Sequence, residues 1–150
     1  ETTEQLTDEL LSEDENKYHA FLILDVDCFK QINDIYGHAV GDIVLQKFGK
    51  LLKGTFREGD ILGRIGGDEF GVIMKNIQTK DIAMKKAEEL LAKTQAYKID
   101  ELKGNNISIS IGISTAPQDG DCYMDLYKRA DQALYQAKRS GKARVCNYFS

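Results

Sequence analysis

The chain has 150 residues, 42% of them hydrophobic and 29% charged, with one proline and a formal net charge of −4. This length and composition fit one domain with a complete core. The acidic balance argues against a broad nucleic-acid-binding surface, although a nucleotide held through a metal needs only a local site. We find no apolar run that could span a membrane and no signal peptide, and three widely spaced cysteines argue against a disulfide framework or a zinc site. We therefore expect a single domain in a reducing, cytoplasmic setting.

The first third of the chain predicts helix, strand, helix and helix. Residues 1–17 are acidic, with leucines at helical spacing, and predict an amphipathic helix. Residues 20–27, "AFLILDVD", are an apolar run ending in acids, which is typical of a central strand buried on both faces. Residues 29–36 predict a short helix that ends at Gly37, and residues 40–56 predict a helix with one apolar face.

The stretch "RIGGDEFGVIM" places two glycines and two acids inside apolar surroundings. Two apolar runs separated by Gly66 and Gly67 predict a β-hairpin with a two-residue turn, in which both central residues need positive φ. One interpretation is a tight turn with Asp68 and Glu69 solvated at its end. The other is a turn whose lack of side chains lets a ligand approach the backbone.

The remaining pattern completes an alternation of strands and helices. Residues 79–97 predict a long helix, and "ISISIGIS" over residues 107–114 alternates strictly, as a strand does. Residues 123–139 predict another helix, and residues 143–149 predict an edge strand. The order βααββαβαβ indicates an α+β domain whose central, mainly antiparallel five-stranded sheet is flanked by helices.

Two carboxylates are expected at the end of the first buried strand. Burying Asp25 and Asp27 without a partner would cost free energy, so we expect a cation or a basic side chain nearby. A hard divalent ion such as Mg²⁺ binds carboxylates together with phosphate oxygens. The following helix start offers the backbone N–H groups of Cys28 and Phe29 to a phosphate, with Lys30 close by. The alternative is a strand end whose acids simply begin a helix.

Two further groups, Asp68 in the hairpin and the pair Lys138 and Lys142, can take part in a site with Asp25 only if the fold brings them close to it. Should the hairpin lie beside the first strand, Asp25 and Asp68 can bind the same ion. Lys138 and Lys142, near the end of the helix over residues 123–139, could neutralise phosphates or form a solvated helix terminus.

Four motifs in this order resemble the GGDEF domain, the catalytic domain of bacterial diguanylate cyclases: "LDVDCFKQINDIYGHAVGD", "DILGRIGGDEFGVI", "ISISIGIS" and "ADQALYQAK" followed by "SGK". The resemblance covers about residues 21–148. It implies a fold like the nucleotide cyclase core and the polymerase palm. Residues 1–150 would then be one GGDEF domain, the C-terminal catalytic part of a longer signalling protein. The family's usual D-x-L-T-G-L-x-N-R segment is missing, so we expect the chain to begin at or just after it.

The resemblance also implies roles for individual residues. Asp25, Asp68 and the Val26 carbonyl would bind Mg²⁺ or Mn²⁺, two ions per GTP. Lys30 would stabilise the charged transition state, and Glu69 would assist deprotonation of the 3′-hydroxyl. The implied substrate-binding residues are Cys28, Phe29, Asn33, His38, Asp42, Gly66, Gly67, Lys138 and Lys142, among which Asn33 and Asp42 would recognise the guanine edge.

The implied activity is condensation of two GTP into cyclic di-GMP and two pyrophosphates at the interface of a homodimer. The family's R-x-x-D inhibitory site, which binds the product, matches Arg57 and Asp60, with Arg64 as a helper; a surface salt bridge has the same spacing. An upstream sensory domain is expected, and the location is cytoplasmic, including the cytoplasmic end of a membrane receptor. Two alternatives stay open: a silent domain that binds GTP or cyclic di-GMP as a receptor, and a related cyclase that accepts ATP or makes a mixed dinucleotide.

Overall fold

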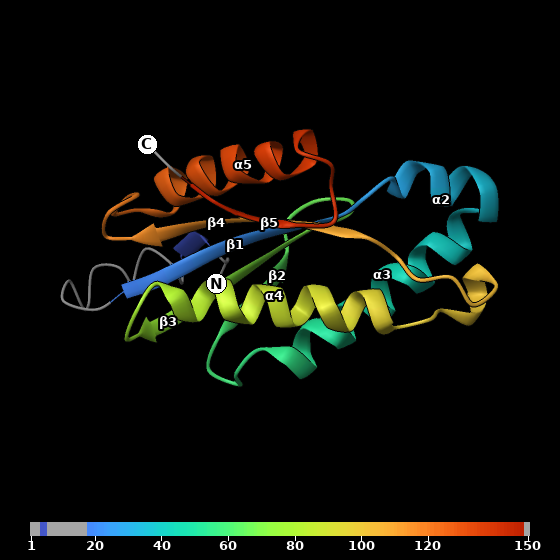
Figure 1. Ribbon diagram of the computed structural model, residues 1–150, viewed down its shortest axis with the longest axis horizontal. Coiled ribbons are helices and arrows are strands. Elements are labelled where there is room, and N and C mark those ends of the chain that lie inside the picture. Colours follow the sequence, from blue (N-terminus) through green and yellow to red (C-terminus); the bar gives the residue numbers. More distant parts are fainter. Residues whose placement is uncertain (1–3, 6–17, 149–150) are drawn as a thin grey trace.

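The computed structural model describes residues 4–5 and 18–148 (Figure 1). Its elements are β1 (Tyr18–Val26), α2 (Phe29–Tyr36), α3 (His38–Thr55), β2 (Ile61–Arg64), β3 (Glu69–Ile77), α4 (Asp81–Ala96), the 3₁₀ turn η1 (Asp100–Leu102), β4 (Ile109–Ala116), α5 (Tyr123–Arg139) and β5 (Val145–Asn147). The predicted order is confirmed. Apart from Glu4 and Gln5, the helix predicted over residues 1–17 lies outside the described residues.

The five strands form one sheet in the order β2-β3-β1-β4-β5. Neighbouring strands are antiparallel except β4 and β5, which are parallel. β1 therefore lies in the middle, as its apolar run predicts, and β5 lies at an edge. The predicted α+β class with a mainly antiparallel sheet is confirmed.

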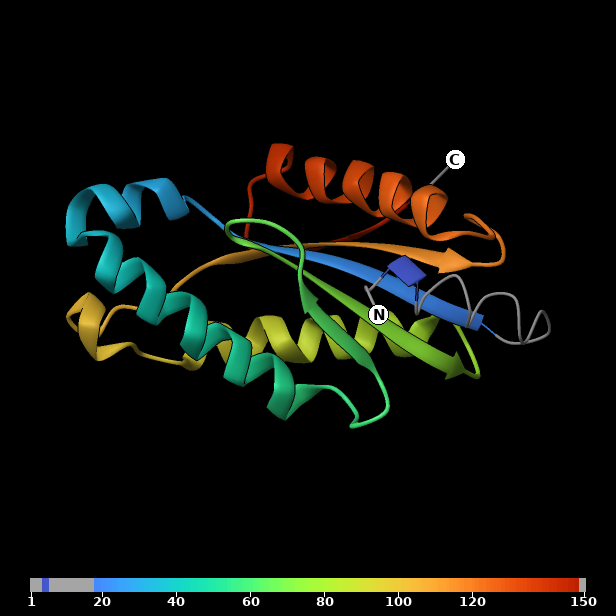
Figure 2. The ribbon, with the colours of Figure 1, turned by 180° about the vertical axis from the view of Figure 1, so that it is seen from behind.

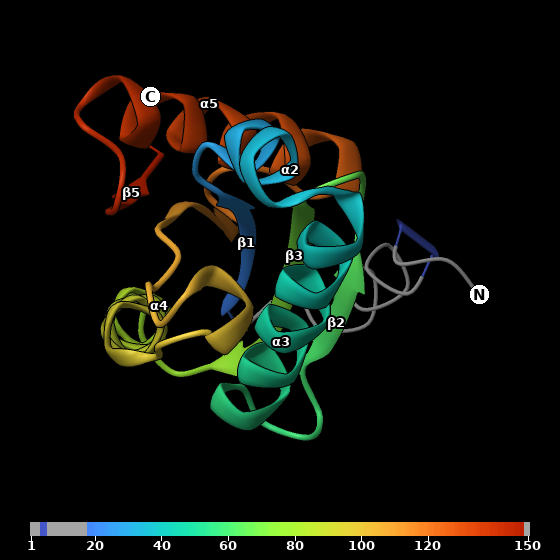
Figure 3. The ribbon, with the colours of Figure 1, turned by 90° about the vertical axis from the view of Figure 1, so that its right-hand side faces the viewer.

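Helices cover both faces of the sheet, with α5 on one side and α3 and α4 on the other (Figure 3). Alternate residues of β1 divide between the two cores. Leu22 and Leu24 belong to the larger apolar cluster, which includes residues of α3 and α4, whereas Phe21 and Ile23 belong to the smaller cluster with α5. No helix within the described part of the chain is both long and apolar enough to cross a membrane.

The turn between β2 and β3 differs from the predicted two-residue turn. The backbone N–H groups of Ile65 and Gly66 both donate to the Glu69 carbonyl, at 2.8 and 3.3 Å, so Asp68 belongs to the loop together with the two glycines. Neither Gly66 nor Gly67 is among the described residues with positive φ. The prediction of a two-residue turn was wrong because four residues, Ile65 to Asp68, separate β2 from β3, and the hydrogen bonds to the Glu69 carbonyl close this longer loop without a left-handed glycine.

The strand predicted over residues 107–114 is displaced by two residues, to Ile109–Ala116. Val26 of β1 faces Ile109, and His19 faces Ala116, so the length of β1 sets both ends of β4. A displacement by two preserves the face of every side chain. Ile107, Ile109, Ile111 and Ile113 accordingly all belong to the larger core, as the alternation predicts.

Three connections meet at one end of the sheet. They are the segment from β1 to α2, the β2–β3 loop, and the segment from α5 to β5 (Figures 1 and 2). Helix α2 extends beyond this end, and none of its residues is buried. The acids at the end of β1, the glycine loop and the segment after Lys138 thus lie together, although the first and last are more than one hundred positions apart in the sequence.

Candidate active site

Asp25 lies near the end of β1, opposite Glu69 of β3 and Ser110 of β4. Its Oδ2 accepts a hydrogen bond from Lys138 Nζ of α5 at 2.5 Å. Its Oδ1 is buried and has no hydrogen-bond partner among the described residues. A buried carboxylate oxygen without a donor is a ligand atom that a hard cation can use.

A second carboxyl stands beside it, as the sequence predicts. The pKa of Asp25 is raised to about 7, first by burial and then by the neighbouring Asp68 carboxyl, while Lys138 opposes both effects. Two carboxyls that share a site cannot both be charged without a compensating cation. The hairpin therefore lies beside the first strand, which is the condition for Asp25 and Asp68 to bind the same ion: β3 pairs directly with β1, and the loop before β3 brings Asp68 to Asp25. This donor set fits a divalent metal ion.

Asp27 does not belong to that pair. Its carboxylate accepts hydrogen bonds from the hydroxyls of Ser108 and Ser110, at 2.6 and 2.7 Å, and from the Ala143 N–H at 3.1 Å. Neutral donors therefore satisfy the Asp27 carboxylate directly, and the expected basic side chain lies nearby as Lys142, whose positive charge Asp27 helps to stabilise. The bond of Asp27 to Ala143 ties the α5–β5 segment to the end of β1, beside Lys142.

Glu69 is half-buried at the start of β3. Its Oε1 accepts a hydrogen bond from the Tyr127 hydroxyl of α5 at 2.9 Å. Burial, together with the neighbouring Glu69 carboxylate, raises the pKa of Tyr127 to about 12, so the phenol stays a donor. Sequence reasoning missed Tyr127, and no local motif around it indicates a site.

The start of α2 gathers backbone donors and basic side chains. Cys28 caps the helix in the left-handed conformation, with φ 55°, and makes no side-chain cap hydrogen bond, so the first N–H groups, beginning with Phe29, are open to a ligand. Lys30 is exposed. Lys142 Nζ lies 3.2 Å from Cys28 Sγ, which places its charge at this helix start.

The two residues expected to recognise guanine lie close together across the α2–α3 corner. The Asn33 amide covers Gly41, because a Cβ added at Gly41 would lie 1.9 Å from Asn33 Oδ1. The next residue, Asp42, is exposed and lines a cavity of about 350 Å³ with Arg64, among others. His38 is exposed at the first position of α3.

The R-x-x-D motif closes the turn between α3 and β2. The Arg57 guanidinium lies 3.0 Å from Asp60 Oδ1 and donates to the Lys75 carbonyl at 2.6 Å. The Arg57 side chain is 55% exposed and that of Asp60 only 1%. Arg64 donates elsewhere, to the Gly67 carbonyl at 2.9 Å, where it supports the glycine loop. The motif is therefore an ion pair in this structure, with its arginine accessible.

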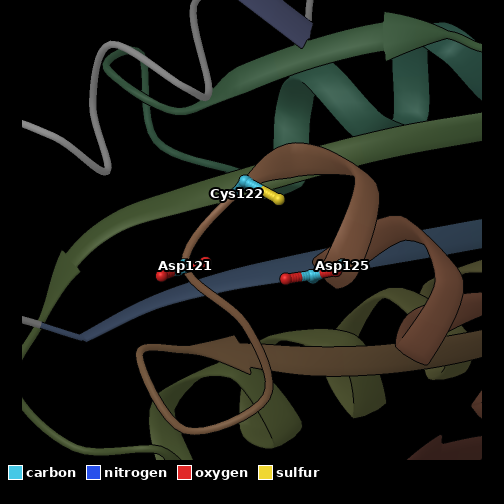
Figure 4. A group of neighbouring side chains, drawn as sticks. All are labelled: Asp121, Cys122 and Asp125. Atoms are coloured by element: carbon cyan, nitrogen blue, oxygen red, sulfur yellow. The ribbon is translucent and has the colours of Figure 1, made fainter.

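A separate group of potential ligands lies at the beginning of α5, at the opposite end of that helix from Lys138. Asp121, Cys122 and Asp125 have side-chain atoms within 4.8 Å of one another (Figure 4). Both acids are exposed. Acidic side chains are common at helix N-termini because the helix dipole favours them, and we attach no function to this group.

The fold of this chain matches those of solved GGDEF domains. The GGDEF domain of TpbB from Pseudomonas aeruginosa superimposes with a TM-score of 0.93 and 32% identity, over 98% of this chain and 93% of that chain. The coiled coil and GGDEF domain of DgcB from Caulobacter crescentus, solved in complex with c-di-GMP, superimposes with a TM-score of 0.85 and 25% identity, over 95% and 77%.

The family described as "Diguanylate cyclase, GGDEF domain" matches residues 2–144, and the chain belongs to this family. Diguanylate cyclase A of Treponema denticola is 40% identical over 127 residues, which cover 84% of this chain and 34% of the relative. The response regulator PleD of Caulobacter vibrioides is 40% identical over 127 residues, which cover 83% and 28%. The chain thus spans about a third of the length of these curated relatives.

Proposed function

We propose that this chain is an active diguanylate cyclase domain, which condenses two GTP into cyclic di-GMP and two pyrophosphates. The observation that carries the proposal is the adjacent pair Asp25 and Asp68, in which the buried Oδ1 of Asp25 has no donor within the described part of the chain. Silent members of the family are expected to lose one of these acids. The chain keeps Asp25, Lys30, Asp68 and Glu69.

Asp25, Asp68 and the Val26 carbonyl would hold the metal. Mg²⁺ or Mn²⁺, two ions per GTP, would lower the pKa of the attacking hydroxyl and neutralise phosphate charge. Since bound metal replaces the proton that burial favours on Asp25, metal binding should weaken as the pH falls below about 7.

The other residues would bind and orient GTP. The N–H groups of Cys28 and Phe29, together with Lys138 and Lys142, would hold phosphates, and Lys30 would offset charge that develops during transfer. Gly66 and Gly67 have no atoms within 4 Å of an added Cβ, so a nucleotide has room beside them.

The reaction itself is an in-line displacement. The 3′-oxygen of one GTP attacks the α-phosphorus of the other, a P–O bond forms, and the bond to pyrophosphate breaks. Glu69, through its carboxylate, would accept the hydroxyl proton. Because each domain holds one GTP, two domains must face each other across a two-fold axis, and a second copy of the chain is a required partner.

The test is incubation of concentrated protein with GTP and Mg²⁺, with ATP and a GTP–ATP mixture in parallel, followed by chromatography. We expect cyclic di-GMP from GTP and no product from ATP. A mixed or adenine dinucleotide would overturn the assignment of base specificity. If no product forms, a fusion to a dimeric helix distinguishes the two remaining cases: activity restored indicates a missing dimer contact, and continued silence supports a receptor.

The receptor alternative has one supporting observation, since the DgcB domain was solved in complex with c-di-GMP. A silent domain would bind cyclic di-GMP or GTP without turning GTP over, and signal through contacts with an upstream sensory domain. Either version would act in the cytoplasm, where GTP is present, including at the cytoplasmic end of a membrane receptor.

Gly41→Ala should weaken GTP binding. The new methyl group would occupy the position of the Asn33 amide, which a flexible side chain can vacate without unfolding the domain. Losing one hydrogen bond to guanine should raise KM for GTP by about tenfold with little change in kcat. The control is Gly54→Ala in the same helix, where an added Cβ meets nothing within 4 Å. An equal KM in both variants would exclude Asn33 from base recognition.

Arg57→Ala should relieve product inhibition. We propose that the accessible Arg57, with Asp60 and Arg64, binds cyclic di-GMP. Arg57 would make a charge-assisted hydrogen bond to a phosphate of the product, and loss of this bond should raise the inhibitory concentration of cyclic di-GMP by about tenfold or more. Arg57 and Asp60 line a cavity at the turn between α3 and β2, and Glu58→Ala, which removes an exposed acid from the lining of that cavity, is the control. An unchanged dose response in Arg57→Ala would leave the motif as a surface ion pair.

A further inference from the structure

Tyr127 connects helix α5 to the signature acid Glu69. Its hydroxyl donates to Glu69 Oε1 at 2.9 Å, across 58 positions of sequence. The phenol ring is itself held in place by aromatic neighbours. Phe21 lies 6.2 Å from it and Tyr123 lies 5.9 Å from it, measured between ring centroids. The donor therefore sits on a packed ring rather than on a free surface side chain.

Helix α5 holds two opposed carboxylates through two different kinds of donor. Asp25 and Glu69 face each other across the β1–β3 ladder, so their side chains lie on the same face of the sheet, which α5 covers. Lys138 pairs with Asp25 as an ammonium, whereas Tyr127 donates to Glu69 as a neutral phenol. A neutral donor fixes the position of a carboxylate without removing its charge, and it leaves Oε2 free.

We propose that Tyr127 is a positioning residue for Glu69, an inference that rests on the proposed cyclase function. The hydrogen bond turns the Glu69 carboxylate toward α5 and keeps it from sharing the cation site of Asp25 and Asp68. Glu69 then stays available to accept the proton of the attacking hydroxyl. Partners of this kind fix the orientation of the side chain that performs the chemistry.

The experiment compares Tyr127→Phe with Tyr135→Phe. Both remove one hydroxyl from α5, but Tyr135 is 61% exposed and its oxygen accepts a long hydrogen bond from Arg139, at 3.3 Å. We expect Tyr127→Phe to lower kcat by about tenfold while KM for GTP changes less than about twofold, and Tyr135→Phe to keep both values. An unchanged kcat in folded Tyr127→Phe, or an equal loss in the control, would overturn the proposal.

A double-mutant cycle with Glu69→Gln shows whether the effect passes through Glu69. In that background Tyr127→Phe should cause no further loss of kcat, because the group it positions no longer acts as a base. Additive losses would contradict positioning. Crystal structures of the wild type and of Tyr127→Phe give a readout that needs no activity: we expect the Glu69 carboxylate to be fixed in the first and displaced in the second. If the wild-type protein forms no product, the proposed cyclase function is wrong. If the Glu69 carboxylate has the same position in Tyr127→Phe as in the wild type, the proposed positioning role of Tyr127 is wrong.

Discussion

Asp68→Ala is expected to abolish turnover of GTP and to leave the fold intact. Asp68 lies in the loop between β2 and β3 and belongs to neither apolar cluster, so its side chain contributes little to the core. Its loss removes one of two adjacent carboxyls, and metal stabilisation of the transition state supplies several kcal/mol. The rate should fall by about 10³-fold or more.

Although its activity should fall, the Asp68→Ala variant should be at least as stable as the wild type. Asp68 raises the pKa of Asp25, so removing it relieves repulsion between two carboxyls. Thermal unfolding should therefore occur at the wild-type temperature or slightly above it. Asp121→Ala, which removes an exposed acid at the far end of α5, is the control and should keep full activity. Normal turnover by Asp68→Ala would show that the metal assignment is wrong.

Gly112→Ala is expected to destabilise the domain more than any surface change. Gly112 lies in β4 beneath α5, and an added Cβ would lie 2.2 Å from the Ala130 carbonyl oxygen and 2.3 Å from the Leu134 nitrogen. Both are backbone atoms of a helix, so relief requires α5 to move away from the sheet. We expect the free energy of unfolding to fall by about 3 kcal/mol, measured by urea denaturation.

The matched control for this substitution is Gly49→Ala, which should act in the opposite sense. Gly49 lies inside helix α3, and an added Cβ there meets nothing within 4 Å. Alanine should raise the free energy of unfolding by about 0.5–1 kcal/mol, because glycine is the poorer helix former. Equal stabilities of Gly112→Ala and wild type would mean that α5 does not pack against β4 as described.

Helices and strands could be predicted from the spacing of apolar residues wherever one face of the element packs against the core. The helix predicted over residues 123–139 is found as Tyr123–Arg139, because its apolar stripe faces the sheet along its whole length. The hairpin turn was not predictable in the same way. Its register depends on the pairing of Arg64 with Phe70, and its loop is supported by the Arg64 guanidinium, which donates to glycine carbonyls.

Some residues of the candidate site could be predicted from the sequence, and others could not. Asp25 and Asp68 could be paired from the sequence only on the condition that the hairpin lies beside the first strand, and the pairing of β3 with β1 meets that condition. The contacts made by α5 could not be predicted, since Lys138 and Asp25 are 113 positions apart, and no local pattern indicates that Tyr127 reaches Glu69. The serine hydroxyls that bind Asp27 could not be predicted either, because Ser108 and Ser110 are 81 and 83 positions away from it.

The most direct test of the account is the dependence of the rate on protein concentration. Cyclic di-GMP formation from saturating GTP and Mg²⁺ is measured over a wide series of dilutions of the wild-type chain. We predict that the specific activity rises with concentration and then saturates, because two domains must meet to join two GTP. A specific activity that stays constant down to the lowest concentration would contradict condensation between two half-sites.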